Sequence, residues 1–445
     1  MTRYALLALF LCLAAPGAWA QTPEPRDPLP LEQVLREALG ANPGLRAATA
    51  AADGAHAGAD AAHAGWYPRV TVSETWQRGD QPVFVFSSLL ASRRFAATNF
   101  AIDQLNQPDA VGVFHGAVSA EQVVFDGGAR RAAVDGARAR AHIADLSVDD
   151  ARLDLAVRVV EAYGRLLTVQ AEGAAARAAV DGGREDLARA ARRRDAGVAT
   201  EAEVLAMTLH LADMEQRVIQ AEGDAAGLRA MLNQLAGAAI NRSFAAVEPP
   251  LAPGGPEPSL DERLADATAH RPELRRADEA MQAARSGERA AHAAFLPHAG
   301  VQAVLDLSGT HLTNRASSWL VGGDVRWSLG IGGTERAGLR AAAAATVRAS
   351  AEADEVRTRA EVDVRTAYYQ AASARAREAV GRATVSAARE SQRIIRDRYE
   401  AGLAPVNDLL GAATTLLDAE TRRVSAVVDT LLAQAHLERA CGRLP

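Results

Sequence analysis

Two glycine-containing turns in the chain are each followed, six residues later, by a carboxylate. Gly197 precedes Glu203, and Gly402 precedes Asp408. One such turn is typical of a plain helical hairpin, but two turns at matching places favour a function. If several copies of the chain surrounded an axis, these carboxylates would form acidic rings at a constriction, and such rings concentrate cations and repel anions.

No catalytic or metal-binding pattern accompanies these carboxylates. The Ser and His residues lie in helical, Ala-rich contexts without a nucleophile elbow, and the chain has no GxxxxGK[ST] loop. His56 and His63 could share one helix face, but a solvated face is the favoured interpretation. His292 and His298 flank Pro297 without the spacing of metal ligands. We therefore expect no enzyme activity, no cofactor and no bound metal.

The composition indicates a helical protein with closely packed helices. Of the 445 residues, 49% are hydrophobic but only 4% are aromatic, and Ala supplies much of the apolar fraction. Ala is the best helix former and its small side chain allows close packing. The net charge is −6 and no basic block stands out, which argues against a nucleic acid partner.

The N-terminus has the pattern of a secretory signal peptide. Arg3 precedes an apolar run over residues 4–15, and Ala18-Trp19-Ala20 forms a cleavage site. A membrane anchor is disfavoured because a spanning helix needs about 20 apolar residues. We assign residues 1–20 to the signal peptide and residues 21–30 to an extended, Pro-rich leader. Cys441 would then be the single mature cysteine, and we expect it to be a small buried residue.

The remaining sequence consists of two similar copies, which is an internal repeat. Residues near the start of each copy recur 229 positions apart, as in the pairs Leu31/Leu260, Pro43/Pro272 and Pro68/Pro297. Later residues recur 205 positions apart, as in the pairs Gly127/Gly332, Tyr163/Tyr368 and Gly197/Gly402. The copies therefore differ by an insertion of 24 residues between Pro68 and Gly127. We divide the chain into two structural repeats, 31–250 and 251–445, each with a helix, a strand hairpin and a long helix pair.

Four segments alternate between apolar and polar residues and predict two β-hairpins. They lie around residues 70–76, 114–124, 301–307 and 319–329. Each would be about 10–12 residues long, which is the length of a transmembrane β-strand, although strands of a soluble sandwich alternate in the same way. The loop of the first hairpin, Gly79 to Gly112, is long, and that of the second, Ser308 to Ser318, is short.

Tryptophan residues near the ends of these segments fit a girdle at a membrane interface; they are Trp76, Trp319 and Trp327. Four strands cannot close by themselves, and lipid does not tolerate an open edge. If the strands span a membrane, the barrel must be shared among several chains.

Long helices follow each hairpin. The stretch from Gly128 to about Arg194 has no Pro and as one helix would reach about 100 Å. A coiled-coil seam runs along it through Leu146, Leu153, Val157, Val160, Gly164 and Leu167. The helix before it, residues 31–66, is broken at Asn42-Pro43. Rods of this length cannot bury their faces alone, so they require neighbours.

Several segments together resemble the TolC-type outer-membrane efflux family. They are Arg398-Tyr399-Glu400-Ala401-Gly402, Asn407-Asp408-Leu409-Leu410, Trp66-Tyr67-Pro68 and Phe125-Asp126-Gly127-Gly128. The resemblance implies a mainly α-helical fold with transmembrane β-structure. In it, a homotrimer builds a β-barrel of 12 strands, four from each protomer, in the lipid of the outer membrane. A hollow α-helical barrel continues it through the periplasm.

The resemblance also implies roles for residues at the two helical turns. Asp408 and its counterpart Glu203 fall on acidic-ring positions, and Tyr399 falls on a gating position. The turns would be periplasmic tips that dock an adaptor protein, through Arg194, Gly197, Val198, Arg398, Gly402 and Leu403. The chain departs from some members at Ala404 and Gly411, so the closed state would be held differently, with Arg194 or Arg398 as candidates.

The function implied is a passive exit duct for small molecules. An inner-membrane pump of the resistance-nodulation-division type and a periplasmic adaptor would supply the cargo. Two alternatives stay open: the outer-membrane duct of a type I protein secretion system, and a periplasmic coiled-coil scaffold without a pore.

Overall fold

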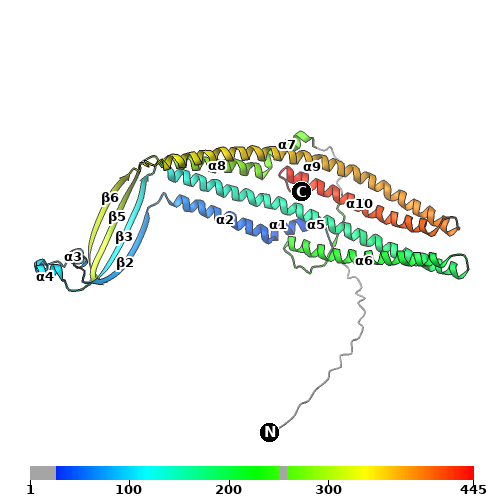
Figure 1. Cartoon of the computed structure of the whole chain (residues 1–445), viewed down its shortest axis with the longest axis horizontal. Coiled ribbons are helices and arrows are strands. Elements are labelled where there is room, and N and C mark those ends of the chain that lie inside the picture. The colour runs from blue at the N-terminus through cyan, green and yellow to red at the C-terminus, as the bar shows by residue number, and fades with distance from the viewer. Residues whose placement is uncertain (1–26, 251–257) are drawn as a thin grey trace, which may run out of the picture.

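The computed structural model describes residues 27–250 and 258–445. The molecule is elongated, with a β-sheet at one end, long helices along its length and two helical turns at the other end (Figure 1). The predicted signal peptide and most of the predicted leader lie outside the described residues. Where the leader enters them, Pro28–Leu29 forms strand β1, which pairs in parallel with β4, Ala245–Ala246.

The same order of helices occurs in both halves of the chain. The first half begins with α1 (Leu31–Ala41) and α2 (Pro43–Ala64), and the second with α7 (Leu260–His270) and α8 (Pro272–Ala293). The matching helices have equal lengths of 11 and 22 residues. The predicted break at Asn42-Pro43 is confirmed, since the Asn42 side chain accepts a hydrogen bond from Leu45 N and caps α2.

Four long helices form the shaft. They are α5 (Ala129–Asp195) and α9 (Thr334–Glu400), each of 67 residues, and the return helices α6 (Glu201–Ala236) and α10 (Val406–Ala440). At about 1.5 Å per residue, α5 and α9 are each about 100 Å long. The predicted seam of α5 is buried along its whole length, and Gly182-Gly183 does not interrupt the helix.

The four predicted strands form one antiparallel sheet in the order β2-β3-β5-β6. The strands are β2 (Arg69–Gly79), β3 (Val111–Phe125), β5 (His298–His311) and β6 (Asn314–Arg326). The predicted second loop, Ser308 to Ser318, is wrong in extent, because cross-strand pairing continues to the pair His311 and Asn314.

This longer pairing also moves two of the tryptophans relative to the strand ends. Trp319 lies inside β6 and not at its end, whereas Trp327 follows β6 and its indole N–H donates to Phe295 O at 3.0 Å. Trp76 lies three residues before the end of β2, as predicted. All three indole rings are exposed.

One face of the sheet is mainly apolar and the other is mainly polar. A row across all four strands joins Val72, Val118, Leu305 and Trp319 on one face, and the next row joins Ser73, Ala117, Asp306 and Ser318 on the other. The outer members of the apolar row are strongly exposed, Val72 at 74% and Trp319 at 77%. The edges of the sheet, β2 and β6, have no further strand partner within the described chain.

None of the helices in the described ranges combines the length and the apolar character that a bilayer-spanning helix requires.

The middle of the shaft is held by buried polar contacts as well as by apolar packing. The Tyr163 hydroxyl, fully buried, donates to Leu29 O at 2.8 Å and accepts from Val247 N at 2.7 Å. Burial raises the pKa of this tyrosine. These bonds tie β1 and the residue that follows β4 to α5. Cys441 is buried, as predicted.

Candidate gate at the helical tips

Each helical tip is a glycine-terminated turn. Gly197 and Gly402 both have φ of 74°, in the left-handed region where a side chain would be strained. In the first tip, Val198 N donates to Arg193 O at 2.8 Å, and in the second, Leu403 N donates to Arg398 O at 2.8 Å. These bonds satisfy the last carbonyl groups of α5 and α9, so the backbone reverses direction within a few residues.

The return helices begin differently in the two tips. In the first, the Thr200 side chain accepts from Glu203 N at 3.3 Å and caps α6. In the second, Pro405 occupies the capping position of α10 and offers no side-chain hydrogen bond. Despite this difference, Glu203 and Asp408 both lie in the first turn of a helix, where the helix dipole stabilises a carboxylate.

The two predicted ring carboxylates have different surroundings. Asp408 is exposed, and Glu203 is half-buried. Tyr399, the predicted gating residue, is 5% exposed and packs with Ala190, Met207 and Leu409. Its hydroxyl is buried and lies near the Glu203 side chain, but no partner among the described residues meets full hydrogen-bond geometry. Burial raises the pKa of Tyr399, and the negative charge of Glu203 raises it further.

The predicted docking residues lie on the outside of the tips. The side chains of Val198 and Leu403 are 67% and 70% exposed. Arg194 pairs with Asp195 at 2.8 Å and with Glu201 at 3.2 Å, both in its own tip. Arg398 is exposed. Within one chain the ion pairs of Arg194 stay in its own tip, and the role of Arg194 or Arg398 in holding the closed state stays a prediction.

Other arginines, which the sequence did not single out, connect the two helical hairpins. Arg193 Nη1 donates to Tyr399 O at 3.0 Å, and its guanidinium carbon lies 5.1 Å from the centre of the Tyr399 ring. Arg189 pairs with Glu400 at 2.7 Å and with Asp186 at 2.8 Å. Asp186 also binds Arg396 of α9 at 3.3 Å. Three contacts thus join α5 to the end of α9.

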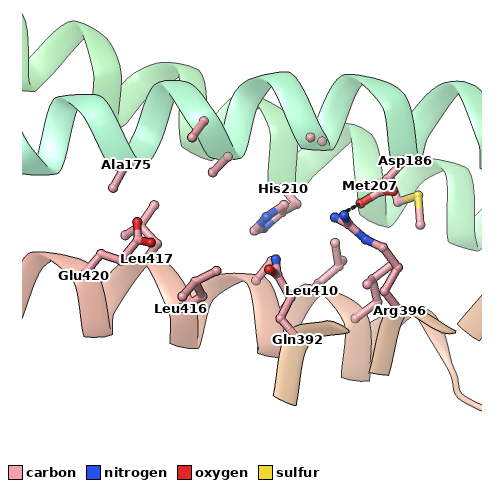
Figure 2. A pocket seen from close by; sticks show the side chains of 16 residues that line it. Ala175, Asp186, Met207, His210, Gln392, Arg396, Leu410, Leu416, Leu417 and Glu420 are labelled. Atoms are coloured by element: carbon pink, nitrogen blue, oxygen red, sulfur yellow. Dashed lines mark hydrogen bonds and ion pairs between the residues drawn. The ribbon is translucent and has the colours of Figure 1, made fainter. Parts of the chain in front are cut away.

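A small cavity lies between the two hairpins, next to these contacts and farther from the tips. Figure 2 shows Asp186 of α5 and His210 of α6 on one side of the cavity. Arg396 of α9 and Leu416 and Leu417 of α10 lie on the other side. Its volume is ≈ 240 Å³, and one wall is made of small residues of α5, namely Ala175, Ala178, Ala179, Gly182 and Gly183. Burial lowers the pKa of His210, which favours its neutral form at the cavity wall.

These features describe contacts that hold two helical hairpins against each other. No group of three or more metal-ligating side chains occurs among the residues that the structure describes. The sequence did carry a signal for the hairpin contacts: Asp186, Arg189 and Arg193 follow each other at steps of three and four, which places them on one face of α5.

Comparisons with known proteins identify the family. The sequence profile described as outer membrane efflux protein matches residues 34–238 and 264–443. Comparison with curated proteins found no match.

Solved structures of outer membrane channels share the fold. The outer membrane protein VceC of Vibrio cholerae superposes with a TM-score of 0.77 at 20% identity, over 93% of this chain and 96% of VceC. The Campylobacter jejuni CmeC outer membrane channel gives 0.80 at 16% identity, over 93% and 85%. The Neisseria gonorrhoeae MtrE outer membrane channel gives 0.73 at 18% identity, over 93% and 89%. The chain belongs to the outer membrane efflux protein family, whose structural relatives are TolC-type channels.

Proposed function

We propose that the protein is the outer-membrane exit duct of a tripartite efflux system. A homotrimer would pass small molecules from a periplasmic adaptor and an inner-membrane pump of the resistance-nodulation-division type to the exterior. Each protomer would give four strands to a 12-stranded barrel, and its long helices would line a periplasmic tube. The repeats 31–250 and 251–445 would each form one half of the protomer, after export directed by residues 1–20.

The observation that carries this proposal is the sheet, which is mainly apolar on one face and has two unpaired edges in the described chain. An exposed row such as Val72 to Trp319 would be unfavourable in water but suits contact with lipid. Lipid in turn requires that every edge be paired. Joining β6 of one copy to β2 of the next would meet both requirements.

The shaft supports the same assembly. Many large apolar side chains on the helices are exposed in the single chain, among them Leu209, Ile219 and Val380. Helices of 67 residues with such faces are stable only when neighbours cover them. A coiled-coil scaffold without a pore would bury the helices but would leave the apolar face of the sheet in water.

Within this duct we assign the gate to the tips. Asp408 and Glu203 would form acidic rings around the axis, with Tyr399 behind them in the contact between hairpins. The adaptor would dock on the outer residues of the tips, which are Arg194, Gly197, Val198, Arg398, Gly402 and Leu403. The indoles of Trp76, Trp319 and Trp327 would contact lipid, with Trp76 and Trp327 near the two interfaces.

Gel migration of outer-membrane fractions, unboiled and boiled, tests the proposal. We expect a heat-sensitive trimer band that conducts ions after reconstitution into planar bilayers. A soluble periplasmic monomer would overturn it. The efflux assignment alone would be contradicted if the trimers insert but loss of the protein stops the secretion of a protein and leaves the export of small molecules unchanged.

A further inference from the structure

The loop between β2 and β3 folds into a small unit of its own. It contains α3 (Pro82–Ala91), the short 3₁₀ helix η1 (Ala97–Phe100) and α4 (Ile102–Asn106). In Figure 1 this unit lies beyond the strands, at the end of the molecule opposite the helical tips. The matching loop between β5 and β6 has only the two residues between His311 and Asn314. The unit is therefore the main difference between the two halves.

Aromatic packing and a polar anchor hold this unit in place. The rings of Phe86 and Phe95 meet edge to face at 4.7 Å, and those of Phe95 and Phe100 at 5.1 Å. Arg93 has φ of 54°, the one non-glycine residue with positive φ in the described chain, and donates to Ser317 O of β6 at 2.9 Å. Because Arg93 keeps an unfavourable backbone conformation while its side chain binds a distant strand, the loop unit has one defined structure.

The unit encloses an open cavity of ≈ 430 Å³. Its lining is mostly methyl groups and rings, from Val83, Val85, Phe86, Leu89, Phe95 and Leu105. Four polar residues also line it, namely Ser87, Asn99, Gln104 and Asp109. This size and this mixture of an apolar wall with a few polar groups are typical of small-molecule sites.

We propose that this cavity binds the alkyl chain of an amphiphile. The lining is mostly apolar and its one charged residue, Asp109, is exposed, which favours a neutral hydrocarbon inside the cavity, and the open side lets a polar head stay in water. Such a chain could come from a membrane lipid or from a free amphiphile that leaves the duct. The lipid source rests on the proposed membrane location, whereas binding of a free chain does not.

Photolabelling of the purified full-length protein distinguishes the two sources. In one arm, the protein is held in phosphatidylcholine nanodiscs whose lipid carries a diazirine in its acyl chain. In the other arm, a free diazirine-bearing hexadecanoic acid is added to protein in unlabelled nanodiscs. Mass spectrometry then locates the label. We expect label on residues 82–106 in at least one arm, and loss of that label when excess plain hexadecanoic acid competes.

A matched pair of variants on α3 tests the cavity itself. Ser87 is exposed and lines the cavity, so Ser87→Trp should fill it and lower labelling of the unit by about tenfold. Leu90 is exposed on the same helix but does not line the cavity, so Leu90→Trp should leave labelling unchanged. Unchanged trimer formation and conductance would show that both variants are folded.

Labelling confined to the strands, or labelling of the unit that survives both Ser87→Trp and competition, would overturn the proposal. Labelling of the unit by the free probe in a chain that forms no membrane-inserted trimer would support the cavity and overturn the duct. The two failures are therefore distinguishable.

Discussion

Replacing Arg193 with Gln should favour the open state of the gate. Arg193 lies near the end of α5 and reaches across to α9, where it donates to Tyr399 O and stacks on the Tyr399 ring. In the proposed trimer the tube is lined by two helical hairpins from each protomer, and its opening would require the two hairpins of a protomer to move relative to one another. In the proposed duct, a contact that exists only while they are packed would therefore stabilise the closed arrangement.

The size of the effect follows from the two contacts. A hydrogen bond from a charged donor contributes about 1.5 kcal/mol, and a partly exposed cation–π contact about 0.5 kcal/mol. The sum of about 2 kcal/mol corresponds to a shift of about 30-fold in the closed-to-open equilibrium of each chain. The ion pair of Arg189 with Glu400 is more exposed, so Arg189→Gln should give only about twofold.

Single-channel recording in planar bilayers measures this shift as open probability. Arg192→Gln is the matched control, because Arg192 is exposed and has no side-chain ion pair or hydrogen bond within the described ranges. We expect the order Arg193→Gln above Arg189→Gln above Arg192→Gln. Equal open probabilities for Arg193→Gln and Arg192→Gln would refute the assignment of the lock to this contact.

Three further predictions concern the proposed acidic ring, stability at acid pH and the buried Tyr163 contacts in the middle of the shaft. Asp408→Ala should weaken block of reconstituted trimers by multivalent cations, because the ring loses three charges in a trimer; unchanged block and conductance would show that Asp408 forms no ring. The pKa of Glu248 is lowered, chiefly by hydrogen bonds from Arg423. Its stabilisation is therefore present above the unfolded pKa and lost as pH falls through the folded pKa. Glu248→Gln should remove about 0.5 kcal/mol at pH 7 and flatten the acid side of the urea-unfolding profile, and an unaltered profile would contradict this. Tyr163→Phe should cost about 1–3 kcal/mol, since it leaves Leu29 O and Val247 N unpaired; a change in urea midpoint no larger than that of an exposed Tyr369→Phe control would count against it.

The elements that the sequence predicted well have strong local signals. The break at Asn42-Pro43, the uninterrupted helix before Gly197 and the glycine turns depend on residues a few positions apart. The alternation of the strands predicted which side chains share a face. It could not predict where pairing ends, because the partners of Ser308 and His311 on β6 extend the hairpin beyond the alternating segments.

The contacts of Arg189 and Arg193 with the end of α9 were not predicted from the sequence, for a related reason. Arg189 and Glu400 are separated by 211 positions, and Arg193 and Tyr399 by 206. The spacing of Asp186, Arg189 and Arg193 places them on one face of α5, but which residues of α9 they contact depends on how the two helices pack, and no local pattern predicts that. Tyr399 was predicted as a gating residue from the family resemblance, yet its role in the structure comes from its backbone carbonyl and ring as much as from its hydroxyl.

Disulfide trapping across the seam between chains tests the central claim most directly. A cysteine at Thr71 on β2 is combined in turn with one at Leu320, Gly322 or Asp324 on β6, all on the polar face of the sheet. Within one chain β3 and β5 lie between them, so the sulfurs are about 14 Å apart and cannot bond. A shared barrel predicts that at least one pair gives covalent trimers on oxidation in the outer membrane. Monomers or dimers alone, for every pair, would contradict it.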